Sequence, residues 1–336
     1  MDVFSAVTTG PSRAHLRAAA IQAAQKLGLF DRLTEESRSI EELAWHLGIE
    51  SEHRLQALLD VLALEGLLAT GTAGEDTSYA LHALVEPGAK LPPLGWGQLA
   101  EVIRRDAPLE EPGVSGVSSG GEALKRFHDH LRTAGSAAAA ELMTPLARSE
   151  GGALLDLGSG AGAYSKAWLD AREEVRAILL DRREVLALAA DALHTNHRDT
   201  NHLRVELIAR ELLAPEPWPA ANVVLLANLL HLFGPEDSQA LVTRAAAACA
   251  PGGLVMIKDL RLDDDHSGPA PGVLFSLNMA LFTEQGRVHT RGALVAFLRA
   301  AGLEKIELRE LASATEAIVA QGRKPQALEE ILHEPR

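Results

Sequence analysis

Three glycines at alternate positions follow an apolar segment and are the residues of this chain best suited to holding a ligand. Gly158, Gly160 and Gly162 come directly after the sequence LLDL, which contains Asp156, and Ser159 lies between the first two glycines. Glycine allows a sharp turn and a close approach of the ligand to the main chain. Open α/β sheets bind nucleotide-like ligands in such loops, at the carboxyl ends of strands. The spacing G-x-G-x-G differs from the G-x-G-x-x-G of dinucleotide enzymes, so it predicts a nucleotide-like ligand without a pyrophosphate.

A second acid, Asp181, ends the next apolar segment, 25 residues after Asp156. A carboxylate at this strand end can accept hydrogen bonds from both hydroxyls of a ribose. A ribose and a need for close backbone approach, with no pyrophosphate, are features of S-adenosylmethionine (SAM), which has a sulfonium and an amino-acid tail. The two segments therefore predict a SAM site. The alternatives are glycines that serve packing and a solvated acid at a strand end.

His231 is the candidate for proton transfer, because it follows an apolar segment in the sequence NLLHLFGPED. Methyl transfer is an in-line displacement at the sulfonium, and a hydroxyl group is a poor nucleophile until its proton is removed. Histidine can remove that proton near neutral pH. The alternative is a histidine that packs at the start of a helix.

The order of apolar and polar segments predicts the elements that hold these residues. After residue 153, continuous apolar runs alternate with helical patterns such as 184–194 and 237–250, as expected of strands covered on both faces. This alternation predicts an α/β fold with a doubly wound, Rossmann-like, mostly parallel sheet of seven strands. The expected strands are residues 153–157, 177–181, 204–208, 222–227, 254–257, 305–311 and 316–321.

The N-terminal part has a different pattern, with helices followed by extended pieces at 67–70 and 79–81. Ser39 and Glu42 have the spacing of a capping box, and the whole predicts a mainly α-helical winged-helix domain. Such a domain binds DNA or serves dimerisation. The helix at 52–64 carries one arginine against Glu52 and Asp60, which favours dimerisation.

Residues 106–121 are rich in Pro, Gly and Ser and predict a linker or a mobile loop, followed by a helix at 123–149. The predicted division is a winged-helix-like dimerisation domain at 1–105, a linker and connecting helix at 106–150, a SAM-binding domain at 151–324, and a C-terminal tail at 325–336.

The composition excludes several classes of protein. The formal charge of −14 and the aromatic content of 4% are unlike the basic, aromatic surfaces that bind nucleic acids, and no apolar run is long enough to cross a membrane. The N-terminus has no secretory signal, and the single cysteine, Cys249, excludes an intrachain disulfide. We expect a cytoplasmic enzyme that binds neither nucleic acids nor membranes.

The histidines do not predict a metal site. His128 and His130 are two residues apart in a helical pattern and point to different faces. No H-x-x-x-H or carboxylate triad spacing occurs at His194, His197, His202 or His289.

Taken together, five segments resemble the class I SAM-dependent methyltransferases, and more narrowly the small-molecule O-methyltransferases with an N-terminal winged-helix dimerisation domain. The segments are LLDLGSGAG, ILLDRREVLALA, LANLLHLFGPED, APGGLVMIKD, and SLNMALFTEQGRVHT with LRAAGL. The resemblance implies a homodimer that methylates a hydroxyl group of a small, aromatic acceptor. It also implies a role in secondary metabolism such as antibiotic biosynthesis.

The resemblance also implies roles for single residues. His231 corresponds to the general base, and Asp259 to one of two acids that orient it, whereas Val288 stands where the second acid is expected. Arg210 stands where the family usually has glycine. Residues expected near the adenine are Glu211, Leu212 and Phe233, and residues expected to line the acceptor site are Phe127, Phe275, Asn278 and Met279.

Two alternatives remain open at this point. The missing second acid leaves room for a C- or N-methyltransferase of the same fold. A winged helix with a SAM-like site could also belong to a ligand-sensing regulator that binds DNA.

Overall fold

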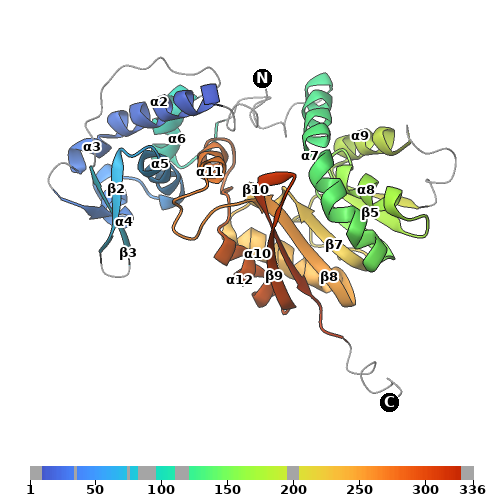
Figure 1. The fold of residues 1–336 in the computed structure, drawn as a ribbon. Helices are drawn as coiled ribbons and strands as arrows, with labels where there is room; N and C mark the ends of the chain where they lie inside the picture. The colour runs from blue at the N-terminus through green and yellow to red at the C-terminus, as the bar shows by residue number, and fades with distance from the viewer. Residues whose placement is uncertain are drawn as a thin grey trace. The chain divides into compact units, whose positions relative to one another are not determined.

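The computed structural model describes residues 10–33, 36–73, 76–81, 96–109, 121–194 and 204–326. It divides into two compact units, each with its own elements (Figure 1). The first unit consists of residues 1–118, 231–233 and 261–290, and the second of residues 119–230, 234–260 and 291–336. Units defined by compactness thus do not follow chain order, and the division predicted from the sequence stays a prediction.

The first unit is mainly helical. Its helices are α2 (Gly10–Leu27), α3 (Leu29–Arg32), α4 (Ile40–Leu47), α5 (Glu52–Leu64), α6 (Leu99–Arg105) and α11 (Ala270–Phe282), and a short 3-10 helix, η1, spans Trp96–Gln98. A small antiparallel sheet has the order β1-β3-β2, with β1 at Arg38–Ser39, β2 at Leu68–Ala73 and β3 at Asp76–Leu81.

Local signals explain where these helices begin and end. Gly28 has a left-handed φ of 73° and separates α2 from α3, within a region whose sequence pattern is helical throughout. The predicted capping box is confirmed: Ser39 Oγ accepts the backbone N–H of Glu42, and the Glu42 carboxylate accepts the N–H of Ser39. α11 packs against α5 although the two are far apart in the chain.

The second unit contains the large sheet, with the order β6-β5-β4-β7-β8-β10-β9. Only β10 runs antiparallel to its neighbours, so the predicted mostly parallel seven-stranded sheet is confirmed. The strands are β4 (Ala153–Leu157), β5 (Arg176–Asp181), β6 (Val205–Ala209), β7 (Ala221–Ala227), β8 (Cys249–Leu260), β9 (Glu304–Leu311) and β10 (Ala314–Arg323).

Helices cover both faces of this sheet (Figure 1). The helices are α7 (Glu122–Ser149), α8 (Ala163–Ala171), α9 (Arg183–His194), α10 (Pro235–Ala248) and α12 (Arg291–Ala300). Residues of α7, α8 and α9 share one core with β4, β5, β7 and β8, and the fully buried Trp168 belongs to it. The continuous apolar strands of the sequence are thus strands buried from both sides.

β8 departs most from the range that its sequence pattern predicts. β8 begins at Cys249 rather than near Leu254, although Gly252 inside it has a left-handed φ of 72°. The pairing with β7 shifts register between Ala221 and Val223. The irregularity accommodates residues 250–253 of β8, which lie between the paired positions Cys249 and Leu254.

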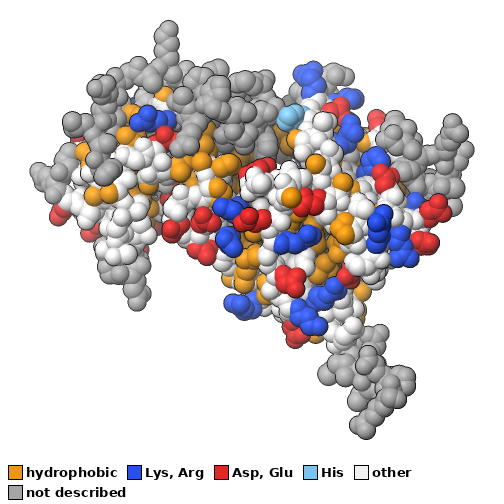
Figure 2. All heavy atoms as spheres, in the orientation of Figure 1, with side chains coloured by type: hydrophobic (Ala, Val, Ile, Leu, Met, Phe, Trp, Pro, Cys, Tyr) orange, Lys and Arg blue, Asp and Glu red, His pale blue; other side chains and the backbone are white. Residues whose placement is uncertain are grey.

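Basic and acidic side chains are interspersed on the face of the described residues shown in Figure 2. That face lacks the continuous basic field by which proteins neutralise nucleic-acid phosphates. In the described part of the chain, helices are too short or too polar to traverse a lipid bilayer.

Candidate active site

The glycine loop follows β4 and has the backbone conformation that only glycine adopts easily. Gly158, Gly160 and Gly162 have φ values of 66°, 56° and 75°, all in the left-handed region. The N–H of Gly158 donates to Leu180 O at 2.9 Å, which ties the loop to β5. A Cβ atom at Gly158 would lie 2.7 Å from Leu229 Cδ1, so close packing as well as φ requires glycine there.

Asp181 is bound to this loop. Its Oδ2 accepts the N–H of Gly160 at 2.9 Å, and its Oδ1 accepts the N–H of Arg182 at 2.7 Å. Each carboxylate oxygen can accept a second hydrogen bond, so Asp181 retains capacity for a ligand. Within the described residues, the buried Ser159 Oγ in the same loop has no hydrogen-bond partner.

Asp156 is buried at the carboxyl end of β4 and accepts a hydrogen bond from Ser165 Oγ at 2.6 Å. Burial, reinforced by the charge of Asp181, raises the pKa of Asp156 to about 6 although the Ser165 bond opposes the shift. Burial, with the charges of Asp156 and Asp259, also raises the pKa of the Tyr164 phenol above its ordinary value. The end of β4 therefore concentrates acids in a desolvated place, where a cationic ligand would be favoured.

The end of β7 is held by a pair of residues that the sequence analysis missed. Asn228 has a positive φ of 51°, and its N–H donates to Lys258 O at 2.7 Å. The Lys258 ammonium donates to Asn228 Oδ1 at 2.6 Å. Burial lowers the pKa of Lys258, although Asp259 opposes the shift. A lone lysine inside an apolar strand was the available signal, because such a group needs a polar partner.

His128 of α7 lies against the glycine loop. A Cβ atom at Gly160 would be 3.5 Å from His128 Nδ1, and in the described structure this buried nitrogen has no partner. Burial lowers the pKa of His128, against the opposing charge of Asp181. The imidazole thus faces the loop with a ring nitrogen that no described residue bonds. Phe127, the neighbouring residue predicted to line the acceptor site, is half-buried and packs edge-on against His128 at 5.4 Å.

The loop after β6 carries Glu211 and Leu212. The N–H of Arg210 donates to Asp181 O at 3.0 Å, so arginine in place of glycine still brings this loop to the end of β5. Arg244 donates to Leu212 O at 2.5 Å, and its guanidinium lies 4.1 Å from the centre of the Trp218 ring.

His231 lies in the short 3-10 helix η3 (Leu230–Leu232), is 8% exposed, and belongs to the first unit. Its ring packs edge-on against that of Phe275 of α11, with the two ring centres 5.1 Å apart. Two further residues predicted to line the acceptor site, Asn278 and Met279, are buried on α11, and within the described part of the chain Asn278 Oδ1 has no hydrogen-bond partner. The structure therefore brings His231 together with Phe275 on one unit.

The remaining predicted residues lie as follows. Asp259 is 3% exposed near the end of β8 in the second unit, and its Oδ1 accepts the N–H of Leu260 at 2.8 Å. Phe233 is half-buried just after η3. Val288, at the position of the expected second acid, is buried, and its N–H donates to Ser276 Oγ at 3.2 Å.

Among the described residues, no group of three or more His, Cys, Asp or Glu side chains could hold a metal ion. His194 has no described side chain, and His197 and His202 lie outside the described residues.

Two family models match the chain. Residues 114–304 match the O-methyltransferase domain, and residues 12–86 match the O-methyltransferase dimerisation domain. The chain belongs to the O-methyltransferase family. This assignment confirms the prediction of a SAM-dependent O-methyltransferase.

Known relatives agree with the assignment. The chain is 28% identical to the tetracenomycin polyketide synthesis 8-O-methyltransferase TcmO of Streptomyces glaucescens, over 91% of this chain and 93% of that protein. It is 27% identical to human acetylserotonin O-methyltransferase, over 89% of this chain and 92% of the human protein. The match thus spans nearly the whole length of both relatives.

Solved structures share the fold of this O-methyltransferase. An O-methyltransferase family 2 protein from Planctomyces limnophilus, solved in complex with apigenin, aligns with a TM-score of 0.70 at 24% identity, over 96% of this chain and all of that one. Human N-acetylserotonin methyltransferase in complex with SAM aligns with a TM-score of 0.56 at 21% identity, over 94% of this chain and 96% of the human chain.

Proposed function

We propose that this O-methyltransferase moves the methyl group of SAM to a hydroxyl group of a small aromatic acceptor, with His231 as the general base. The observation that carries the proposal is the position of His231: three residues after Asn228 at the end of β7, buried, with its ring against Phe275. The relatives act on, or were solved with, aromatic compounds such as acetylserotonin and apigenin, which supports an aromatic acceptor here.

The residues of the second unit fit SAM. The three loop glycines have left-handed φ values, and a Cβ atom at Gly160 would meet only His128, at 3.5 Å, so the main chain there has few close neighbours among the described residues. Ser159 Oγ and His128 Nδ1 lack partners in the described structure, and Asp156 supplies negative charge. We assign Asp156, Gly158, Ser159, Gly160 and Gly162 to the methionine part. Asp181 is assigned to the ribose, and Glu211 and Leu212 to the adenine, together with Phe233, which belongs to the first unit.

When bound, SAM supplies an electrophilic methyl group. In the proposed mechanism His231 accepts the proton of the acceptor hydroxyl at a ring nitrogen, which leaves an oxygen nucleophile. Asp259 would hold the imidazole in the productive orientation, as a carboxylate holds the histidine of a catalytic triad. Phe127, Phe275, Asn278 and Met279 would shape the acceptor site, where Met and aromatic side chains suit flat rings.

The proposal includes a homodimer formed through the N-terminal domain. It also includes a division of the chain after residues 105, 150 and 324, and a cytoplasmic location. The dimerisation-domain match at 12–86 supports the dimer. Sedimentation velocity at several concentrations tests it, and a monomer at micromolar protein contradicts it. The DNA-binding alternative loses support because Arg54, the arginine of the expected recognition helix, is fully buried.

The test of function combines binding and turnover. Calorimetry should detect SAM binding to the purified chain, and incubation with labelled SAM and a panel of phenols and polyketide-like acceptors should yield a methylated product. NMR of the product decides between O-, C- and N-methylation, a choice that the absent acid at Val288 makes relevant.

A His231→Asn variant should lose turnover by at least about 10²-fold while binding SAM as the wild type does. His46→Asn, a change of another histidine of the first unit, is the matched control and should leave turnover unchanged. Turnover that survives in His231→Asn contradicts the general-base role, because proximity alone would then account for the rate.

A further inference from the structure

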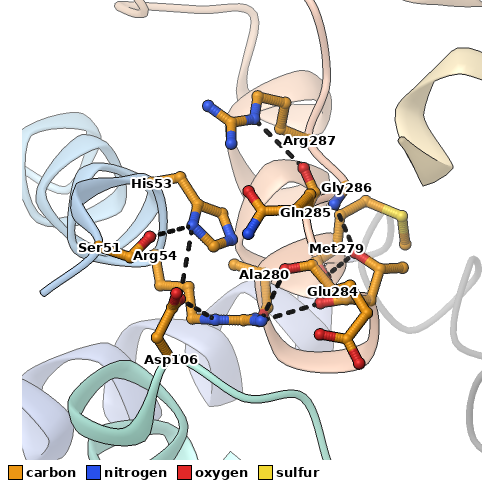
Figure 3. A network of polar contacts seen from close by, with 11 residues as sticks. Ser51, His53, Arg54, Asp106, Met279, Ala280, Glu284, Gln285, Gly286 and Arg287 are labelled. Carbon is orange, nitrogen blue, oxygen red and sulfur yellow. Dashed lines mark hydrogen bonds and ion pairs between the residues drawn. The ribbon is translucent and has the colours of Figure 1, made fainter. Parts of the chain in front are cut away.

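Arg54 of α5 is the most buried charged residue in the described chain and has no role in the function proposed above. Its side chain is 0% exposed, and a guanidinium is rarely buried to this extent unless it is paired. Its Nε donates to Asp106 Oδ1 at 2.9 Å. The rest of the guanidinium turns away from this carboxylate toward α11 (Figure 3).

Three backbone carbonyls, in the last turn of α11 and just after it, accept hydrogen bonds from the guanidinium. Arg54 donates to the carbonyl oxygen of Ala280, to Thr283 O at 3.1 Å and to Glu284 O at 2.8 Å. The last carbonyls of a helix have no partner within the helix, and a cation at this end also suits the helix dipole. Arg54 therefore caps α11 from another helix.

The capped end of α11 continues into a turn that touches the backbone of His231. The N–H of Gly286 donates to Thr283 Oγ1 at 2.9 Å, and Thr283 Oγ1 donates to Met279 O at 2.6 Å. A Cβ atom at Gly286 would lie 2.6 Å from His231 O and 3.1 Å from the carbonyl carbon of Leu232. The turn thus packs directly on η3, with no room for a side chain.

His53, which precedes Arg54 in the chain, adds no charge to the contact between Arg54 and α11. Burial, helped by the positive charges of Arg54 and Arg287, lowers the pKa of His53 to about 4. His53 is therefore neutral near pH 7, and Asp106 is left to pair with Arg54. The residues of this network come from α5, from the end of α6 and from the α11 segment (Figure 3).

The two ends of this contact lie in different family domains. Arg54 is within the dimerisation-domain match at 12–86, whereas α11 and the turn are within the O-methyltransferase match at 114–304. The Arg54 side chain thus joins the part of the chain matched as a dimerisation module to the helix and turn that adjoin His231.

We propose that Arg54 is a positioning residue for methyl transfer. By fixing the end of α11 and the turn at 283–286, it holds the backbone of His231 and the α11 residues Phe275, Asn278 and Met279 in one arrangement. The proposal rests on the proposed function, because it gives these residues their roles. A misplacement of a catalytic group by about 1 Å can cost up to about 10²-fold in rate.

The experiment uses the full chain with Arg54→Lys and Arg54→Met. Arg204→Lys is the matched control, because Arg204 of the second unit also binds three carbonyls, those of Leu169, Arg172 and Val175. We expect Arg54→Met to lower kcat and raise the acceptor KM, together between about tenfold and 10²-fold. Arg54→Lys, which keeps the charge but not the fork of donors, should retain part of the activity. SAM affinity should stay within about twofold in both, and Arg204→Lys should lower Tm without changing the acceptor KM.

Combining Arg54→Lys with His231→Asn in a double variant separates a positioning role of Arg54 from a role in stability alone. If Arg54 acts through His231, Arg54→Lys should not further reduce the residual rate of His231→Asn. Full additivity overturns the proposal, and so do unchanged kcat and KM in a folded Arg54→Lys. Should Arg54→Met fail to fold, Arg54→Lys alone decides.

Hydrogen exchange gives a readout that does not depend on activity. Arg54→Lys should speed exchange in peptides that cover 229–234 and 276–290, while Arg204→Lys leaves them unchanged. Faster exchange in a chain whose wild type has no methyltransferase activity would refute the proposed function but keep the mechanical link. Unchanged exchange refutes the link itself.

Discussion

The Asp181 carboxylate accepts the backbone N–H of Gly160 at 2.9 Å, so the acid that ends β5 and the loop that follows β4 form one hydrogen-bonded unit. The other carboxylate oxygen accepts the N–H of Arg182. Asp181 therefore shapes the loop in addition to its proposed contact with ribose, and both tasks need acceptors only.

This double task makes Asp181→Asn a sharp test. An amide presents an N–H₂ group toward one of two N–H donors, so one hydrogen bond is replaced by a donor–donor clash. We expect SAM to bind at least about tenfold more weakly by calorimetry, because the amide offers the ribose one acceptor oxygen fewer and a hydrogen bond to a charged group contributes about 1.5–3 kcal/mol. Asp191→Asn, at an exposed acid of α9, is the control and should bind normally. Equal affinity in both variants would contradict the double role.

Gly158→Ala should weaken both folding and SAM binding. The added Cβ would lie 2.7 Å from Leu229 Cδ1, and the φ of 66° is unfavourable for alanine. Gly302→Ala measures the cost of the positive φ alone, because Gly302 has a φ of 75° with nothing within 4 Å of its Cβ position. The control should lose about 1–2 kcal/mol of stability, and Gly158→Ala should lose more, as measured by urea unfolding. A smaller loss for Gly158→Ala would mean that Leu229 moves aside at little cost.

SAM binding should release a proton near pH 6. The pKa of Asp156 is raised to about 6 by burial, so a large share of these side chains is protonated at that pH. A cationic sulfonium nearby favours the carboxylate and lowers this pKa, which expels the proton. Calorimetry in buffers of different ionisation enthalpy measures the release. It should vanish in Asp156→Asn, and in the wild type at pH 8, and a release that persists in Asp156→Asn would assign the proton to another group.

Acid should destabilise the first unit through His53. Its pKa is lowered from 6.5 to about 4, chiefly by burial, so the unfolded chain binds a proton that the folded chain refuses. The protonation of His53 does not affect the free energy of unfolding above pH 6.5, and it lowers that free energy as the pH falls toward 4. His53→Gln should flatten the decline in urea midpoint over this range. A decline as steep as in the wild type would show that other groups cause it.

His266 has the opposite sign. Its hydrogen bond to Asp60 Oδ2 at 2.7 Å raises the pKa of His266. The stability that this pair contributes is present in full below pH 6.5 and is lost as the pH rises through the raised pKa. Asp60→Asn should therefore cost more stability at pH 6 than at pH 8, measured by thermal unfolding. A cost that is equal at both values would indicate that the pair does not involve a charged imidazole.

The sequence by itself determined the features that depend on neighbouring residues. Continuous apolar runs gave the strands, and β4 spans the same residues, 153–157, that the pattern predicts. The glycine loop was evident because left-handed φ values at three alternate positions need glycine. The capping box at Ser39 has a fixed local spacing and was equally readable.

Only the tertiary structure decided which distant groups meet. The helix at 52–64 was interpreted through its one arginine, yet Arg54 is buried against Ala280, 226 residues away in the chain. Lys258 and Asn228, 30 residues apart, are paired for the same reason. A buried charge must find hydrogen-bond partners, but its own segment does not encode where they lie. That information resides in how the apolar faces of helices and strands pack, which brings η3 and α11 into the N-terminal unit.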